Sequence, residues 1–153
     1  MITLEVIILV LISYLTGAFP SAVWVGKVFY NTDVREYGSG NAGATNTFRV
    51  LGKSAGAPVL FMDIFKGWLA VNYVCLLGDL TSLPNEIIFE IQLVSGIAAV
   101  IGHLFPVYTG FRGGKGIATM LGLLIGLHFQ AALFSLFVFI FIFIISRYVS
   151  LGS

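Results

Sequence analysis

Long apolar runs alternate along this chain with two short polar stretches. Five runs are long and apolar enough to be predicted as membrane-spanning helices, at 4–29, 55–78, 86–104, 115–129 and 130–146. Only weakly polar residues separate the last two runs, so 115–146 is also described well as a single apolar hairpin. The pattern predicts an all-α, polytopic membrane bundle of about five spans, with residues 1–153 forming one domain.

Composition and charge agree with a membrane protein. The chain is 58% hydrophobic and only 10% charged, with a mean hydropathy of +1.01, outside the range of soluble domains. With five spans, one side of the membrane carries only acidic residues: Glu5, Asp79, Glu86 and Glu90. The other side carries every basic residue, namely Lys27, Arg35, Arg49, Lys53, Lys66, Arg112, Lys115 and Arg147. The positive-inside rule therefore predicts a cytoplasmic basic side and an external N-terminus.

The two polar stretches, 38–49 and 102–119, are rich in glycine. Small residues let backbone N–H groups approach an oxyanion closely, and Arg49 and Lys115 supply the opposite charge. Both stretches are therefore predicted to be cytoplasmic loops that hold phosphate, and the helices are expected to bring them together.

Nucleotide and metal chemistry are disfavoured. The spacing of Gly38, Gly40 and Gly43 matches a dinucleotide fingerprint, but no strand precedes it and a membrane span follows. The 110–116 segment lacks the spacing and the Ser or Thr of a Walker A loop. His103 and His128 are predicted on opposite membrane faces without a cluster of carboxylates or thiolates. We therefore expect no metal, no cofactor and no nucleic-acid partner.

Three positions inside or next to the spans have alternative interpretations. Pro20, among small residues, predicts a kinked and buried first span, in which the proline either has a functional role or is simply tolerated by a membrane helix. Asp63 and Lys66 lie three residues apart toward the cytoplasmic end of the second span, where they form either a salt bridge or, through Lys66, a direct ligand contact. His103 either plays a structural role or orients a phosphate or hydroxyl group of a substrate.

A set of motifs in a fixed order closely resembles the bacterial membrane acyltransferase family PlsY, from about residue 10 to the end of the chain. The motifs are Tyr14-Leu15-x-Gly17 with Pro20, Gly38-Ser39-Gly40-Asn41-x-Gly43-Ala44-Thr45-Asn46 with Arg49 and Gly52-Lys53, Asp63 with Lys66-Gly67, and Gly102-His103-x-Phe105-Pro106 with Gly113-Gly114-Lys115-Gly116 and Ala118-Thr119.

The resemblance implies transfer of a fatty acyl group from acyl phosphate to the 1-hydroxyl of glycerol 3-phosphate, giving lysophosphatidic acid. It implies a bacterial inner-membrane protein with seven helices, so this chain is expected to lack the C-terminal spans. The expected partners are acyl phosphate, glycerol 3-phosphate and the lipid bilayer, with functional coupling to an enzyme that forms acyl phosphate.

Carried over onto this sequence, the resemblance places Ser39, Arg49, His103 and Lys115 in the active site. The residues expected to bind substrate phosphate are Gly38, Gly40, Asn41, Gly43, Thr45, Asn46, Lys66, Gly113 and Gly114. The alternative is a small transporter or channel for phosphorylated anions. Transporters usually place their sites near the bilayer midplane and contain repeated halves, whereas the ionisable residues here gather at one face.

Overall fold

The computed structural model describes residues 4–76 and 80–147, and every regular element in these ranges is a helix. In chain order the elements are α1 (Leu4–Gly17), α2 (Ser21–Tyr30), η1 (Val34–Glu36), α3 (Ala44–Leu51), α4 (Lys53–Asn72), η2 (Tyr73–Leu76), η3 (Leu80–Ser82), α5 (Asn85–Leu104), η4 (Val107–Thr109), α6 (Ile117–Leu127) and α7 (Phe129–Ser146). The predicted all-α membrane fold is confirmed.

The apolar helices differ in length. Three helical segments are long and apolar enough to cross a membrane: Lys53–Cys75, Asn85–Thr109 and Phe129–Ser146. The bent pair α1 and α2 adds a fourth crossing if it forms one span. By contrast, α6 has 11 residues, or roughly 16 Å at the usual rise per residue, about half of a bilayer core. The predicted span 115–129 is therefore a shorter helix than expected.

The first apolar run is broken, as the sequence predicts. The axes of α1 and α2 differ by 41° across the short break that contains Pro20. At this break the carbonyl of Phe19 accepts hydrogen bonds from the backbone N–H of Ser21, at 3.0 Å, and from Lys66 Nζ, also at 3.0 Å. The break therefore exposes a backbone carbonyl to the interior of the bundle.

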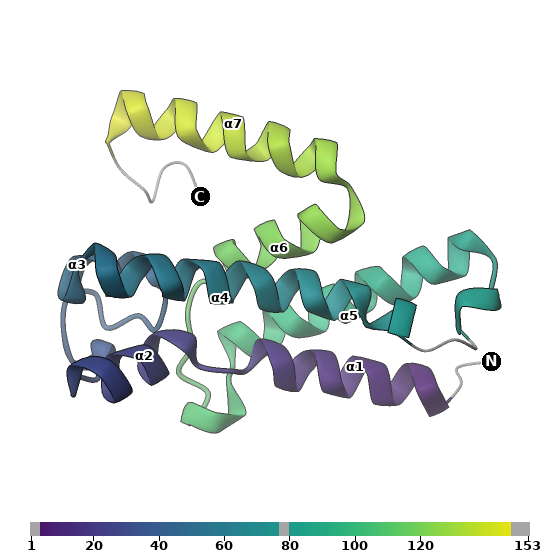
Figure 1. Cartoon of the computed structure of the whole chain (residues 1–153), viewed down its shortest axis with the longest axis horizontal. Coiled ribbons are helices and arrows are strands. Elements are labelled where there is room, and N and C mark those ends of the chain that lie inside the picture. The colour runs from purple at the N-terminus through teal and green to yellow at the C-terminus, as the bar shows by residue number, and fades with distance from the viewer. Residues whose placement is uncertain (1–3, 77–79, 148–153) are drawn as a thin grey trace.

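Helix α4 lies between α1 and α6 and also contacts α2, α3 and α5 (Figure 1). Glycines let two helix pairs approach until backbone touches backbone. A Cβ atom at each of these glycines would overlap the neighbouring helix: Gly17 against Ala99 and Gly102 against Tyr14 in the α1–α5 pair, and Gly67 against Thr119 and Gly122 against Ile64 in the α4–α6 pair. These contacts hold the four helices in a fixed register.

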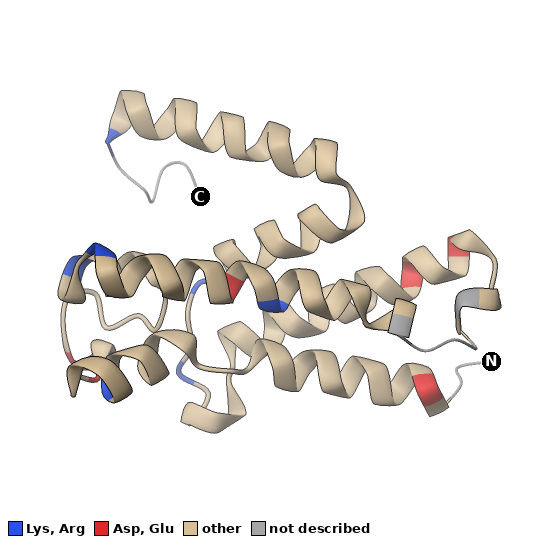
Figure 2. Cartoon of the chain, viewed as in Figure 1, with Lys and Arg blue, Asp and Glu red and all other residues tan. Residues whose placement is uncertain are grey.

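The outermost helix is α7, which contacts α6 and buries only Ala132. Figure 2 shows that the two ends of the bundle differ in charge, because among the described residues only one end holds basic side chains. Acidic residues mark the N-terminal ends of α1 and α5, through Glu5 and Glu86, whereas basic residues gather toward the end that holds α3. Asp79, expected on the acidic side, lies outside the described residues.

Arg35 ties the segment before the first glycine-rich loop to the segment before the second, through a hydrogen bond that a local salt bridge supports. The Asp33 carboxylate accepts a hydrogen bond from the Arg35 backbone at 3.1 Å and pairs with Arg35 Nη2 at 2.8 Å. Arg35 Nη1 donates to the carbonyl of Thr109, 74 residues away, at 3.1 Å. The Arg35 guanidinium holds the pKa of the Asp33 carboxyl well below its usual range, so this connection should persist in mild acid.

We expect Gly122→Ala to destabilise the bundle, because its Cβ would overlap the backbone carbonyl of Ile64. Overpacking of this kind costs about 1–3 kcal/mol. Thermal unfolding in detergent measures the effect, and Met120→Leu on the exposed side of the same helix provides the control. Equal midpoints for wild type and Gly122→Ala would show that α4 and α6 do not pack this closely.

We expect Arg35→Ala to speed amide hydrogen exchange in 105–112, because it removes the donor to Thr109. Lys27→Ala is the matched control, since Lys27 also pairs with Asp33, at 3.2 Å, but with a largely exposed side chain.

The low pKa of the Asp33 carboxyl also predicts how this connection responds to pH. A carboxyl whose pKa is lower in the folded state stabilises that state at pH values above its unfolded pKa of about 3.9. The stabilisation is lost as the pH falls toward the folded pKa. Protection in the wild type should therefore be unchanged between pH 8 and about pH 5; loss within this window would contradict the ion pair.

Candidate functional site

The first glycine-rich loop is organised by one buried amide. Gly38 and Gly40 both have positive φ, 64° and 71°, a conformation that favours glycine. Asn46 is 2% exposed; its Nδ2 donates to the carbonyls of Val34 at 2.7 Å and Tyr37 at 3.1 Å. Its Oδ1 accepts from the Ser39 backbone at 2.9 Å. In the structure the Asn46 side chain thus orders the loop, and its predicted part in binding phosphate stays a prediction.

The second loop folds back onto the end of α5. Gly114 donates its backbone N–H to the carbonyl of His103 at 3.1 Å. A Cβ at Gly113 would overlap that carbonyl oxygen, and a Cβ at Gly114 would overlap His103 Nε2. Glycine is therefore needed at both positions for this close contact with His103.

The two loops touch, as the sequence predicts. The backbone N–H of Ala42 donates to the carbonyl of Gly113 at 3.3 Å, and a side chain at Gly43 would meet Gly114. Each loop leads directly into a helix, α3 after Gly43 and α6 after Gly116. Helix N-termini attract anions. The N-termini of α3 and α6, next to the contact between the two loops, therefore form a favourable place for phosphate groups.

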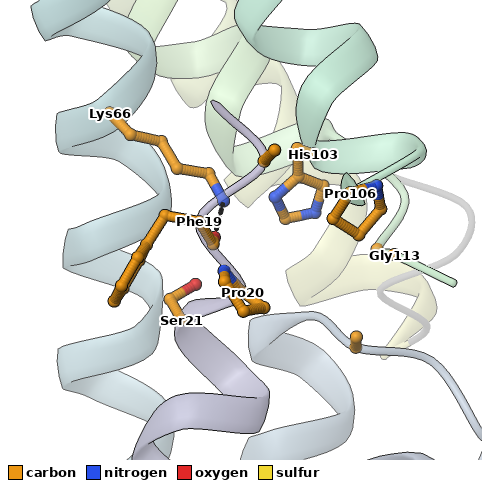
Figure 3. A pocket seen from close by; sticks show the side chains of 10 residues that line it. Phe19, Pro20, Ser21, Lys66, His103, Pro106 and Gly113 are labelled. Atoms are coloured by element: carbon orange, nitrogen blue, oxygen red, sulfur yellow. Dashed lines mark hydrogen bonds between the residues drawn. The ribbon is translucent and has the colours of Figure 1, made fainter. Parts of the chain in front are cut away.

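A small cavity lies beneath this contact (Figure 3). Its volume is about 10 Å³, roughly enough for one water molecule. Its walls come from the α1–α2 break, the first loop, α4, the end of α5 and the second loop: Ala18, Phe19, Pro20, Ser21, Ala42, Lys66, His103, Pro106, Gly113 and Gly114. Of the predicted site residues, the structure thus brings Lys66, His103, Gly113 and Gly114 to one place.

A buried carboxylate connects these walls. Asp63, in the middle of α4 rather than near its end, is 1% exposed. Its Oδ1 lies 2.9 Å from Lys66 Nζ and 3.4 Å from His103 Nδ1, and it accepts a hydrogen bond from Ser21 Oγ. The predicted Asp63–Lys66 salt bridge is confirmed. Within the described residues, Asp63 Oδ2 is buried without a hydrogen-bond partner.

Most of the other predicted site residues are exposed, and two of them, Thr45 and Arg49, lie on helix α3 rather than in a loop. Ser39, Arg49 and Lys115 are exposed, together with Gly38, Gly40 and Thr45, whereas Asn41 is half-buried and Gly43 is buried. The side chain of Arg49 passes close to Gly38. Among the described residues, Arg49 and Lys115 form neither an ion pair nor a side-chain hydrogen bond, so both charges are available to a ligand.

A larger apolar groove of about 690 Å³ adjoins the cavity and shares three wall residues with it, Phe19, Pro20 and Lys66. The rest of its wall is mostly apolar and comes from α1, α2, α4 and η4: Ile12, Leu15, Thr16, Trp24, Met62, Phe65, Leu69 and Tyr108. Its size is typical of ligand pockets. Lys66 therefore lies where the polar and apolar spaces meet.

The sequence marks Ser21 as unusual for a plain membrane anchor and Arg35 as one of the basic residues, but it did not predict the contacts of either. Both act through contacts to distant residues, Ser21 to Asp63 and Arg35 to Thr109. A serine directly after a helix-breaking proline and an Asp-x-Arg pair before a glycine-rich loop were the available signals. Within the described residues, no group of three His, Cys, Asp or Glu side chains is placed to hold a metal ion.

Comparisons with known proteins agree on one family. Residues 7–153 match the family model described as glycerol-3-phosphate acyltransferase. The chain is 45% identical over 148 residues to the glycerol-3-phosphate acyltransferase of Staphylococcus saprophyticus, covering 97% of this chain and 73% of that protein. The same shares and the same identity hold for the glycerol-3-phosphate acyltransferase of Staphylococcus aureus strain bovine RF122.

Two crystal structures of PlsY (YgiH), described as an integral membrane glycerol 3-phosphate acyltransferase, have a similar fold. Its glycerol 3-phosphate form has a TM-score of 0.80 and 36% identity, covering 97% of this chain and 70% of that one. Its lysophosphatidic acid form has a TM-score of 0.81 and 35% identity, covering 97% and 69%. The chain described here therefore belongs to the glycerol-3-phosphate acyltransferase family of integral membrane proteins.

Proposed function

We propose that this protein transfers a fatty acyl group from acyl phosphate to the 1-hydroxyl of glycerol 3-phosphate, releasing lysophosphatidic acid and phosphate. The reaction takes place at the cytoplasmic face of the bacterial inner membrane, with the N-terminus outside. Membership of an acyltransferase family argues against an anion transporter. The observation that carries the proposal is the backbone contact between Ala42 and Gly113, which brings the two glycine-rich loops together.

Two loops suit this reaction because both substrates carry phosphate. Lys115 neutralises one phosphate together with backbone amides of the second loop other than that of Gly114, whose N–H bonds the His103 carbonyl. Arg49 with the 38–46 loop holds the other phosphate. Both cations are exposed, so they can reach anions that arrive from water or from the membrane surface. Ser39 donates a hydrogen bond to a phosphate or to the oxyanion that develops on the acyl carbonyl.

The chemistry requires positioning more than activation. Acyl phosphate is a mixed anhydride with a good leaving group, so the 1-hydroxyl can attack the acyl carbon directly. The new bond joins that oxygen to the acyl carbon, and the bond from the acyl carbon to the phosphate oxygen breaks. The departing phosphate accepts the hydroxyl proton, so the step needs no covalent intermediate on the protein.

The apolar groove gives the acyl chain a place beside the loops. Phe19, Pro20 and Lys66 line both the groove and the small polar cavity. A chain lying along α1 and α4 would therefore end at the site where its phosphate head group meets the loops. In this arrangement acyl phosphate reacts with glycerol 3-phosphate from water while its acyl chain stays in the membrane.

The direct test is phosphate release from a long-chain acyl phosphate by the purified protein, with and without glycerol 3-phosphate. We expect release to depend on glycerol 3-phosphate and to equal the lysophosphatidic acid formed. Release that ignores glycerol 3-phosphate, or transfer from another class of donor only, would contradict the proposal.

We expect Arg49→Ala and Lys115→Ala each to lower turnover at least about a hundredfold, because each removes a charge that stabilises the transition state. Lys53→Ala, another exposed cation outside both loops, is the matched control and should retain activity. Steady-state assays with both substrates measure the effect. Near-normal turnover in either loop variant would remove that residue from the proposed site.

We expect Leu69→Trp to reduce the preference for long acyl chains, because the larger side chain fills part of the groove. Loss of contact with two methylene groups corresponds to about 1.6 kcal/mol, or roughly a 15-fold lower ratio of kcat/KM for long over short acyl phosphates. Phe134→Trp on the exposed side of α7 serves as control. An unchanged ratio would place the acyl chain elsewhere.

A further inference from the structure

The apolar groove has a closed end away from the glycine-rich loops. Its walls reach Ile12 on α1 and Leu69 on α4, two helices that run side by side (Figure 1). About one turn further from the loops, Leu9 and Val74 are buried together in an apolar cluster. The two helices thus close again beyond the groove, so the residues at this end limit how far an acyl chain can extend along the protein.

Two hydroxyl groups meet at the closed end of the groove. Tyr73, the first residue of η2, shares a hydrogen bond of 2.8 Å with Thr16 Oγ1, and Thr16 lines the groove. The Tyr73 side chain also packs against the apolar cluster that contains Leu9 and Val74. The Tyr73 ring therefore lies between the groove and this cluster, and its hydroxyl ties it to α1.

This hydrogen bond is difficult to break from inside the groove. The groove wall beside it and the cluster behind it are mostly apolar, and a hydroxyl group that loses its partner in such surroundings is costly. A saturated acyl chain carries no group that could replace the partner. A chain that passed the Tyr73 ring would also have to displace close-packed side chains of the cluster. The hydroxyl pair therefore resists the passage of a hydrocarbon chain more than apolar packing alone would.

The pair lies within reach of a chain whose reactive end is at the loops. Lys66 borders both the polar cavity and the groove. From Lys66 to Tyr73 the chain makes about two helical turns, or about 10 Å along the helix axis. A long acyl chain that starts near Lys66 is longer than this when it is extended. Such a chain therefore meets the hydroxyl pair before its tip is reached.

We propose that the hydrogen-bonded pair Thr16–Tyr73 is the stop of the acyl-chain groove and sets the longest stretch of acyl chain that the protein holds. The inference rests on the proposed function in one respect, namely that the groove holds the acyl chain of the donor or product. Chain atoms up to the pair contact the groove, and a longer tail turns out into the bilayer, where it gains no contact with the protein. The pair determines acyl-chain length and does not touch the reacting atoms.

Two variants remove the stop in different ways. Tyr73→Leu takes away the ring with its hydroxyl and leaves a space beside Leu9. Thr16→Val/Tyr73→Phe removes both hydroxyls at nearly constant volume, which is close to neutral for stability, so it keeps the test open where Tyr73→Leu fails to fold. Without the hydrogen bond, the Phe ring is free to turn aside. Tyr30→Leu is the matched control, because the Tyr30 hydroxyl also donates to α4, to Ser54 Oγ at 3.1 Å, but at the other end of that helix.

The first readout follows the tip of the chain by photolabelling. The probe is lysophosphatidic acid with a diazirine at the tip of a long saturated acyl chain, and mass spectrometry identifies the labelled residues. We expect labelling of Leu9 or Val74, both almost fully buried, in the two test variants but not in the wild type or Tyr30→Leu. Labelling of either residue in the wild type, or of neither in a folded test variant, overturns the proposal. A probe with the diazirine at mid-chain should label Leu69 in the wild type, and its failure to do so would place the chain elsewhere and overturn the proposal as well.

The second readout is kcat/KM for a series of saturated acyl phosphates of increasing chain length, at saturating glycerol 3-phosphate. In the wild type the value should stop rising once the chain reaches the pair. In the test variants it should continue to rise, by about fourfold for one further methylene group in contact. The same limiting chain length in the wild type and in both test variants overturns the proposal. Labelling needs binding but no turnover, so a protein inactive with acyl phosphate would contradict the proposed function and leave the labelling result as the measure of the stop.

Discussion

The site depends on a contact in which backbone meets backbone. Ala42 and Gly113 are joined by a hydrogen bond of 3.3 Å, and Gly43 and Gly114 lie beside it without side chains to separate the loops. Larger residues here would push the loops apart. The absence of side chains therefore lets the loops meet.

The helices make this contact possible because they pack with their backbones touching. Reciprocal glycine contacts lock α1 to α5 and α4 to α6, so the segments after α2 and after α5 emerge next to each other. The break at Pro20 then turns the chain and opens the Phe19 carbonyl to Lys66. A polar cavity and an apolar groove form on the two sides of this break, a combination that fits a substrate with an anionic head and a fatty chain.

Much of this arrangement could be predicted from the sequence, because it depends on local patterns. Apolar runs predicted the helices, Pro20 predicted the bend, and a spacing of three residues predicted the Asp63–Lys66 pair. The extent of α6 was harder to predict, because Gly116 and His128 bound it in a run that is apolar throughout. Contacts between distant segments could not be predicted. No spacing in the sequence shows that the Asn46 side-chain amide donates to the carbonyls of Val34 and Tyr37. The roles of Ser39, Arg49 and Lys115 stay predictions.

Hydrogen exchange during a titration with lysophosphatidic acid shows whether the two loops form a single site. This molecule carries both the acyl chain and the phosphate of the proposed product. We expect amides in 38–46 and in 110–116 to become protected together, with one common midpoint. Protection confined to one loop, or two separate midpoints, would contradict a shared site.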